Sequence, residues 1–243
     1  MPDTHKNSYT LVFIIVTSVI CSVVIALSVL ILRDRQLENI ALDKKKNILS
    51  ASGIVKKGSR LKRVDILKLY DEKIKSRVIN TAGQVVKNKM AEKLDPRKDV
   101  GFLPLYYMEK DRRVHAYIIP ISGKGLWSTI YGYLALKADA ITVKGITFYQ
   151  HGETPGLGGE IEKDWFTNSF VGKRIVTTDK VFVSVRIARG KVKGKVAESK
   201  LDHYVDGISG ATMTTRGLDK FLKENLLSYE PYFKRIRQSY KDQ

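Results

Sequence analysis

Residues 115–150, HAYIIPISGKGLWSTIYGYLALKADAITVKGITFYQ, decide the fold class. Three runs, 115–122, 128–137 and 141–150, are rich in β-branched and aromatic residues, and short polar or glycine-containing segments separate them. Such runs are typical of strands. Strands that follow one another this closely pair antiparallel. In the third run the apolar residues alternate around Gly145, where we expect a bulge.

Helical segments are predicted before and after these strands. Residues 66–79 carry apolar side chains at helical spacing, and so do residues 216–236, where Pro231 is expected to end or bend the helix. Prolines at 96 and 104 are expected to break regular structure. Alternating valines in 180–196 predict a further strand that turns near residue 190. The soluble part is therefore predicted to be α+β, with a twisted antiparallel sheet flanked by helices.

Residues 11–32, LVFIIVTSVICSVVIALSVLIL, contain no charge, proline or glycine. As a helix this run is long enough to cross a hydrocarbon core of about 30 Å. It lacks the short apolar core and small-residue cleavage site of a signal peptide, so we expect an uncleaved transmembrane helix. The predicted organisation is a tail at 1–10, the span at 11–32, a basic connector at 33–65 and a soluble domain at 66–243.

The net charge of +18 agrees with a nucleic acid, an anionic lipid or an acidic protein as partner. No zinc-finger spacing or RNA-binding aromatic motif accompanies the charge, which favours a solvated, membrane-facing or partner-facing surface over nucleic acid. The single cysteine, Cys21, excludes an internal disulfide and a cysteine-cluster metal site. Positive charge is denser after the span than before it, and taken alone this would place the large domain in the cytoplasm.

Three segments have the composition of a site. SGKGLWST (122–129) sets Trp127 beside glycines, although its spacing alone favours a core role for this tryptophan. HGETPGLGGEI (151–161) is glycine-rich but has neither Walker A nor dinucleotide spacing, and His151 and Glu153 lack a third metal ligand. DGISGATMT (206–214) offers several hydroxyl groups, which a turn or helix cap would explain equally well. No histidine lies near enough to activate them, so no catalytic acid or base and no metal ligand is predicted.

Taken together, the apolar span, RDRQLENIALDKKKNIL, PLYYMEKDRRVHAYIIPISGKGLWSTIYGYLAL, ITVKGITFYQHGETPGLGGEI and DGISGATMT resemble the C subunit of the sodium-translocating NADH:quinone reductase over nearly the whole chain. The resemblance implies an FMN esterified through its phosphate to the threonine that ends S-G-A-T, here Thr212. It also implies an electron relay within a multi-subunit membrane complex, a flavin transferase for maturation, and a flavin domain on the outer side of the bacterial inner membrane. On orientation we follow the resemblance rather than the flanking charge.

The same resemblance implies the residues around the flavin. Those expected to bind the cofactor are Leu126, Trp127, Ser128, Thr154, Gly156, Leu157, Gly158, Lys195, Asp206, Ser209, Gly210, Ala211 and Thr212. Leu126, Trp127 and Ser128 would wall the ring, and Lys195 would be an electrostatic partner of the flavin or its phosphate. The small neighbours of Thr212, Gly210 and Ala211, would leave room for a modifying enzyme.

Two alternatives stay open. The electron-carrying G subunit of a related ion-translocating electron-transport complex shares the T-P-G-L-G and S-G-A-T elements, although the G-L-W-S-T form favours the C subunit of the quinone reductase. A cofactor-free, membrane-anchored binding module would explain the basic run 44–63 instead, and would bind nucleic acid or anionic lipid in a salt-sensitive way.

Overall fold

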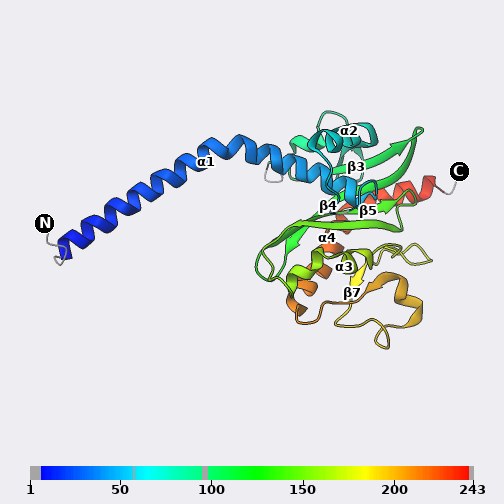
Figure 1. The fold of residues 1–243 in the computed structure, drawn as a ribbon. Coiled ribbons are helices and arrows are strands. Elements are labelled where there is room, and N and C mark those ends of the chain that lie inside the picture. The colour runs from blue at the N-terminus through cyan, green and yellow to red at the C-terminus, as the bar shows by residue number, and fades with distance from the viewer. Residues whose placement is uncertain (1–6, 57, 95–97, 241–243) are drawn as a thin grey trace. The chain divides into compact units, whose positions relative to one another are not determined.

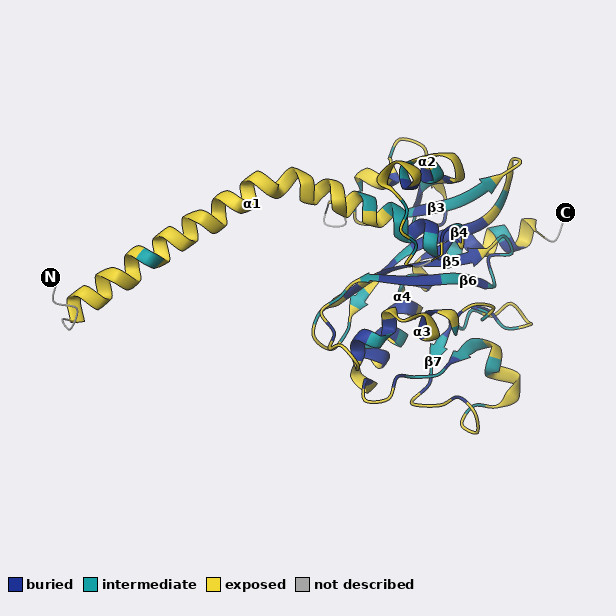
Figure 2. Ribbon diagram, viewed as in Figure 1, coloured by how far each residue is buried: buried dark blue, intermediate teal, exposed yellow. Residues whose placement is uncertain are grey.

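The computed structural model describes residues 7–56, 58–94 and 98–240, and the chain divides into two compact units after Asp43. The described residues of the first unit all lie in α1 (Asn7–Ala51), and this helix continues into the second unit. The predicted span lies within α1. The apolar side chains of residues 11–32 are exposed (Figure 2), and the helix is long and apolar enough to cross a membrane. The hydroxyl groups of Thr17, Ser22 and Ser28 donate to carbonyl groups four residues earlier, at 2.6–2.8 Å. These hydroxyl groups therefore have hydrogen-bond partners inside the helix. A polar group in an apolar environment requires such a partner, because no water is available there.

The second unit is built around a six-stranded antiparallel sheet with strand order β2-β1-β3-β4-β5-β6 (Figure 1). Its strands are β1 (Ile74–Asn80), β2 (Val85–Val86), β3 (Phe102–Lys110), β4 (Arg113–Lys124), β5 (Thr129–Lys137) and β6 (Val143–Gln150). The helices are α2 (Arg63–Lys73), α3 (Asp164–Asn168) and α4 (Thr212–Ser239), with 3-10 turns η1 (Ala91–Lys93), η2 (Gly158–Glu162) and η3 (Glu198–His203). Two short strands, β7 (Arg186–Ile187) and β8 (Tyr204–Val205), pair parallel. The predicted α+β class is confirmed.

Both faces of the sheet are covered, which explains why β4 and β5 are apolar without alternation. Four consecutive residues of β4 and five of β5 are buried. Ile119 and Leu134 belong to the core cluster that includes Leu218 and Phe221 of α4. Their neighbours in the strands face the other way, since successive side chains alternate between faces. Figure 1 shows α2 and α4 on different sides of the sheet.

The predicted bulge in β6 is confirmed. The register between β5 and β6 shifts where Ala135 pairs with Gly145 and Leu136 with Val143, which leaves Lys144 as the extra residue. The last turns of α1 approach β6 at this point. A side chain at 145 would lie 2.5 Å from the carbonyl oxygen of Ala51. Residues 44–51, within the predicted connector, thus belong to the second unit, with Ile48 and Leu49 buried.

The predicted helix over 66–79 is wrong in its second half. The helix α2 ends at Lys73 and the chain continues as β1, where Ile74, Val78 and Ile79 are buried. Their spacing fits one helical face as well as a strand buried on both sides. The β-branched composition and the pairing of β1 with both β2 and β3 favour the strand.

Regular structure also continues through Pro104, against expectation, whereas Pro96 lies outside the described residues. Pro104 pairs with Val78 of β1, while the ladder between β3 and β4 begins only at Tyr106. Pro104 therefore has a paired strand on one side only, as a residue of an edge strand does, and proline is tolerated in that position. Its carbonyl oxygen accepts a 2.8 Å hydrogen bond from the hydroxyl of Tyr229 on α4.

The strand predicted over 180–196 is wrong except at β7. Lys180 and Ser184 adopt left-handed backbone angles, with φ of 61° and 67°, which interrupt an extended chain. The backbone of this region bonds to loops instead, as when the N–H of Val183 donates to Ile175. Alternating valines predicted burial correctly for Val185 but not the pairing that makes a strand.

The helix α4 does not end at Pro231, which lies inside it. Tertiary contacts hold the turns beyond the proline. Tyr232 and Phe233 are buried, and the buried guanidinium of Arg237 pairs with Glu230 and donates to the carbonyl of Ala140 at 3.1 Å. Packing and this ion pair compensate for the hydrogen bond that proline removes.

Replacing Arg237 by methionine should lower the free energy of unfolding by about 3–5 kcal/mol, because the Glu230 carboxylate would be left buried without its partner. The double variant Arg237→Met/Glu230→Gln should recover most of this loss. Urea unfolding of the full chain in detergent measures both. Equal stabilities for the single and double variants would contradict the assigned ion pair.

Candidate functional site

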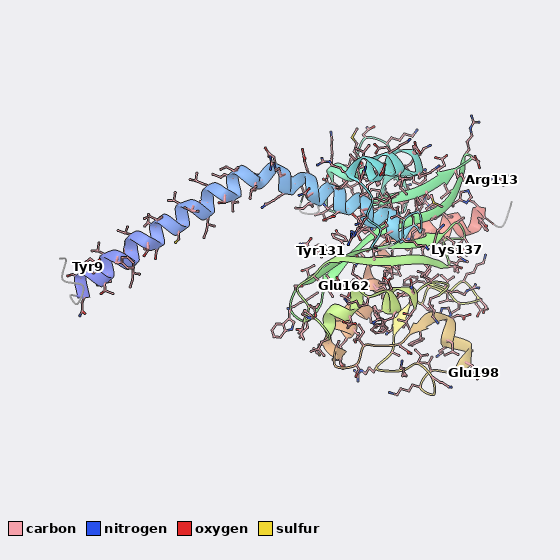
Figure 3. All side chains as sticks on the ribbon, viewed as in Figure 1. Tyr9, Arg113, Tyr131, Lys137, Glu162 and Glu198 are labelled. Carbon is pink, nitrogen blue, oxygen red and sulfur yellow. The ribbon has the colours of Figure 1, made fainter. Side chains whose placement is uncertain are left out.

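The three segments singled out in the sequence meet at one end of β5, around the buried carboxylate of Glu153, which is only 5% exposed. Oxygen Oε1 accepts from the backbone N–H groups of Trp127 at 3.0 Å and Ser128 at 3.3 Å. Oxygen Oε2 accepts from the N–H of Leu126 at 3.2 Å and the hydroxyl of Thr214 at 2.6 Å. In Figure 3, Tyr131 marks this end of β5 and Lys137 the opposite end. One side chain thus binds residues that lie 25 to 61 positions away from it in the sequence.

The hydrogen bonds to Glu153 keep it ionised. Burial of the carboxyl acts to raise its pKa, but the Thr214 hydroxyl and the three N–H groups of the 126–128 turn more than offset this. The pKa therefore lies below its ordinary value of 4.5. A carboxylate with this many donors is suited to holding structure together rather than to exchanging protons.

Two glycines allow the loops to pack on this carboxylate. A Cβ atom at Gly158 would lie 2.6 Å from the Thr214 hydroxyl oxygen and 2.8 Å from Oε2 of Glu153. Gly210 has a φ of +75°, and a Cβ atom there would lie 2.7 Å from a methyl group of Leu157. The predicted residues 157–158 and 210 therefore lie in contact across the site.

The structure distinguishes the hydroxyl groups at the start of α4. Thr214 is 1% exposed and donates to Glu153, while the buried Thr215 donates to the carbonyls of Ala211 and Thr212. Thr212 is exposed, and none of the hydrogen bonds found among the described residues involves its hydroxyl. Ser209 is also exposed but precedes the helix. Thr212 is therefore the hydroxyl both at the helix and open to solvent.

The alternative that a hydroxyl group of the 206–214 segment caps the following helix is wrong for α4. Ala211, which is buried, occupies the N-cap position, and no side chain in the described part of the chain caps the helix. The first N–H groups of a helix have no partner within it. The N-terminus of this 28-residue helix therefore presents free donors beside Thr212, and such ends attract phosphate groups.

Exposed apolar side chains surround this helix end. Trp127 is 70% exposed, so the core role that its spacing favoured is wrong. Leu126, Leu157 and Met213 are also more than two-fifths exposed. Scattered apolar side chains are normal on a surface, but these four come from three segments that converge on Glu153, and we call them the apolar platform.

The other predicted site residues have less direct placements. The hydroxyl of Ser128 accepts a 2.6 Å hydrogen bond from the N–H of Gly152, so it joins two loops. Thr154 is exposed, and its carbonyl accepts from Leu157 and Gly159. Gly156 is exposed with a φ of +76° and open space where a Cβ atom would lie. This turn shapes the loop and leaves its outer side accessible.

Asp206 organises the neighbouring basic loop. Its carboxylate accepts a 2.7 Å hydrogen bond from the N–H of Val192 and pairs with Lys191 at 3.2 Å. The Val192 N–H is the main cause that holds the pKa of Asp206 below its ordinary value. Lys195 donates to the carbonyl of Arg189 at 3.1 Å, so the hydrogen bond found for its ammonium group lies within that loop.

Sequence reasoning missed Glu153 and Thr214 as the centre of the site and Met213 as part of its wall. In the sequence, Glu153 stands out only beside His151, in a pair that lacks the third ligand of a metal site. One acidic residue at the end of a strand, followed by four glycines or prolines within six positions, was the available signal. The turn whose N–H groups it binds lies 25 to 27 residues away, so no local pattern connects the two.

Comparison with known families defines the class of domain. The sequence model of the family described as "FMN-binding domain" matches residues 125–226, which include residues 125–129 of the first converging segment and all of the other two. The second unit of this chain thus contains an FMN-binding domain.

Relatives define the family more narrowly. The C subunit of the Na(+)-translocating NADH-quinone reductase from Pasteurella multocida is 36% identical over 88% of this chain and 87% of its own length, and the C subunit from Yersinia pestis is 32% identical over 94% and 92%. The solved C subunit from Parabacteroides distasonis superimposes with a TM-score of 0.72 at 33% identity, covering 83% of this chain and 96% of its own. The chain belongs to the family of C subunits of the Na(+)-translocating NADH-quinone reductases.

The lowered pKa of Glu153 predicts a pH dependence of stability. A carboxyl whose pKa is depressed on folding contributes stability above its unfolded pKa, and this is lost as the pH falls through the folded value. Near neutral pH, Glu153→Gln should lower the free energy of unfolding by about 1–3 kcal/mol, since a donor loses its acceptor. Between about pH 6 and pH 3 the difference from wild type should shrink, since only the wild-type side chain titrates.

Urea unfolding at several pH values tests this. A difference that is constant with pH would mean that the charge of Glu153 does not matter.

Proposed function

We propose that this chain is the flavoprotein subunit of a Na+-translocating NADH:quinone reductase, and that it carries FMN joined by a phosphoester to the Oγ1 atom of Thr212. The observation that carries the choice of atom is the exposure of the Thr212 hydroxyl at the first residue of α4. The buried hydroxyl groups of Thr214 and Thr215 are already donating. A transferase needs an accessible nucleophile, and Thr212 offers one.

The residues present fit such a group at both of its ends. A phosphate on Thr212 would lie at the free N–H groups of α4 and gain from the helix dipole. The apolar platform of Leu126, Trp127, Leu157 and Met213 would pack against a planar ring. Tryptophan and leucine from separate segments are suited to contact such a ring from different directions. Attachment by the phosphate also leaves the ring free to lie on this platform.

The flavin, when bound, supplies reversible transfer of one or two electrons, and the chain supplies position and electrostatics. No proton-transfer residue is required for this task, which agrees with a Glu153 that stays ionised. We propose that other subunits oxidise NADH and reduce quinone, and that this subunit relays electrons between them. A flavin transferase would be needed for maturation.

We propose the predicted tail at 1–10 and the span at 11–32 in α1 as the membrane anchor, with a connector that is shorter than predicted because the second unit begins at Lys44. We propose that the flavin domain lies on the outer side of the bacterial inner membrane. A covalent bond would keep the cofactor from diffusing away there. The G subunit of a related complex is less well supported, because the curated relatives described above are C subunits.

Replacing Thr212 by alanine should abolish covalent flavin in protein co-produced with a flavin transferase, because the acceptor oxygen is gone. Flavin fluorescence of the denatured chain on a gel measures this. Thr212→Ser should keep a signal, and the matched removal of a buried hydroxyl, Thr214→Val, should keep it too. A dark wild-type band, or a fluorescent Thr212→Ala band, would contradict the proposal.

An outer location predicts that a cysteine at position 199 reacts in spheroplasts with a maleimide that cannot cross membranes. Ser199 is exposed in η3, and changing Cys21 to serine removes the background thiol. A cysteine at position 7, before the apolar run, should react only after permeabilisation. The opposite labelling pattern would place the domain in the cytoplasm, as the flanking charges alone suggest.

A further inference from the structure

The backbone turn of Leu126, Trp127 and Ser128 is held by one anion. Three consecutive N–H groups converge on the Glu153 carboxylate, at 3.2, 3.0 and 3.3 Å. Successive N–H groups that converge in this way form an anion-binding concavity. Here a side chain of the same protein fills the concavity. The N–H of Gly125 also donates to the carbonyl of Ser128 at 2.8 Å, so the hairpin closes the turn and the carboxylate holds the N–H groups within it.

The position of the Trp127 side chain depends on this turn. At 70% exposure, the indole has little packing of its own against the protein. Where packing does not fix a side chain, its location follows from the backbone that carries it. The same holds for Leu126, which is 44% exposed. Release of the turn would thus release the aromatic part of the apolar platform.

The second oxygen of the same carboxylate reaches the helix that bears Thr212. Oε2 accepts from the hydroxyl of Thr214, which is 1% exposed and lies two residues beyond Thr212 on α4. Gly158 packs on both groups, so the 154–159 loop is held against the same pair. One ionised side chain connects the platform to the attachment point.

We propose that Glu153 is the positioning residue of the flavin site, which holds Trp127 and Leu126 against a flavin attached at Thr212. This inference rests on the proposed function. Glu153 does not need to touch the flavin, since it acts through the 126–128 turn on one side and through Thr214 on the other. Its role is to hold the apolar platform at a fixed position relative to Thr212, the attachment point of the flavin.

The chemistry of the four donors predicts which changes matter. A glutamine at 153 has a single acceptor oxygen, and its NH₂ group would face N–H donors that cannot reverse their direction. The Thr214 hydroxyl can rotate to accept, whereas the backbone N–H groups cannot. Glu153→Gln should therefore loosen the turn strongly. Thr214→Val removes one of four donors at nearly constant shape and should act more weakly, and Thr214→Ser restores the donor.

The experiment compares covalent flavin with flavin environment in the full chain, co-produced with a flavin transferase and purified in detergent. Fluorescence of the denatured protein on a gel reports attachment, and fluorescence of the folded protein reports quenching of the flavin by a stacked indole. We expect Glu153→Gln to keep the gel signal and to raise the folded-state fluorescence several-fold. Thr214→Val should raise it less, and Thr214→Ser should return it to the wild-type level.

A double-mutant cycle with Trp127→Phe distinguishes positioning of Trp127 by Glu153 from a general loosening of the flavin site. If Glu153 acts through Trp127, Glu153→Gln should add little to the fluorescence of the Trp127→Phe variant. An unchanged fluorescence in Glu153→Gln, or an equal increase with and without Trp127, would overturn the inference. If Glu153→Gln loses its covalent flavin, the cycle of Thr214→Val with Trp127→Phe decides by the same criterion. A wild-type protein without gel fluorescence would instead refute the proposed function.

Discussion

The arrangement of the site depends on the hydrogen bonds that the buried carboxylate of Glu153 accepts. The carboxylate brings together a turn before β5, a glycine-rich loop after β6 and the first turn of α4. Removing a charge from water is costly unless donors compensate it. Four donors do so here, and the cost of leaving any of them unpaired fixes all three segments at once. The sheet positions these segments, and the carboxylate makes them one site.

Much of the sheet could be predicted from the sequence. The strands β4, β5 and β6 have β-branched and aromatic runs, and the break in alternation at Gly145 marks a bulge. The spacing in β1 instead predicts a helix, because its three buried residues fit both periods. Residues 180–187 alternate like a strand, yet positive φ angles at Lys180 and Ser184 prevent one. At Ser184 the backbone N–H donates to the carbonyl of Ile175, a contact with another segment that the alternation of valines does not reveal.

The site could be predicted as a group of segments but not as a geometry. The composition of residues 206–215 offers several hydroxyl groups that a sequence cannot rank, and only burial separates Thr212 from Thr214. The spacing around Trp127 favours a core residue because tryptophan is usually buried, whereas its exposure gives the site an apolar wall. The contact between Glu153 and Thr214 spans 61 positions, so it follows from the fold rather than from spacing.

The central claim is that one defined oxygen atom carries the cofactor. Cleavage after Lys200 and Arg216 releases the peptide 201–216, which contains Ser209, Thr212, Thr214 and Thr215. Fragmentation of this peptide in a mass spectrometer, from protein matured with a flavin transferase, locates any flavin phosphate among them. The account predicts the added mass on Thr212. Added mass on another hydroxyl of the peptide, or an unmodified peptide from flavin-containing protein, would contradict it.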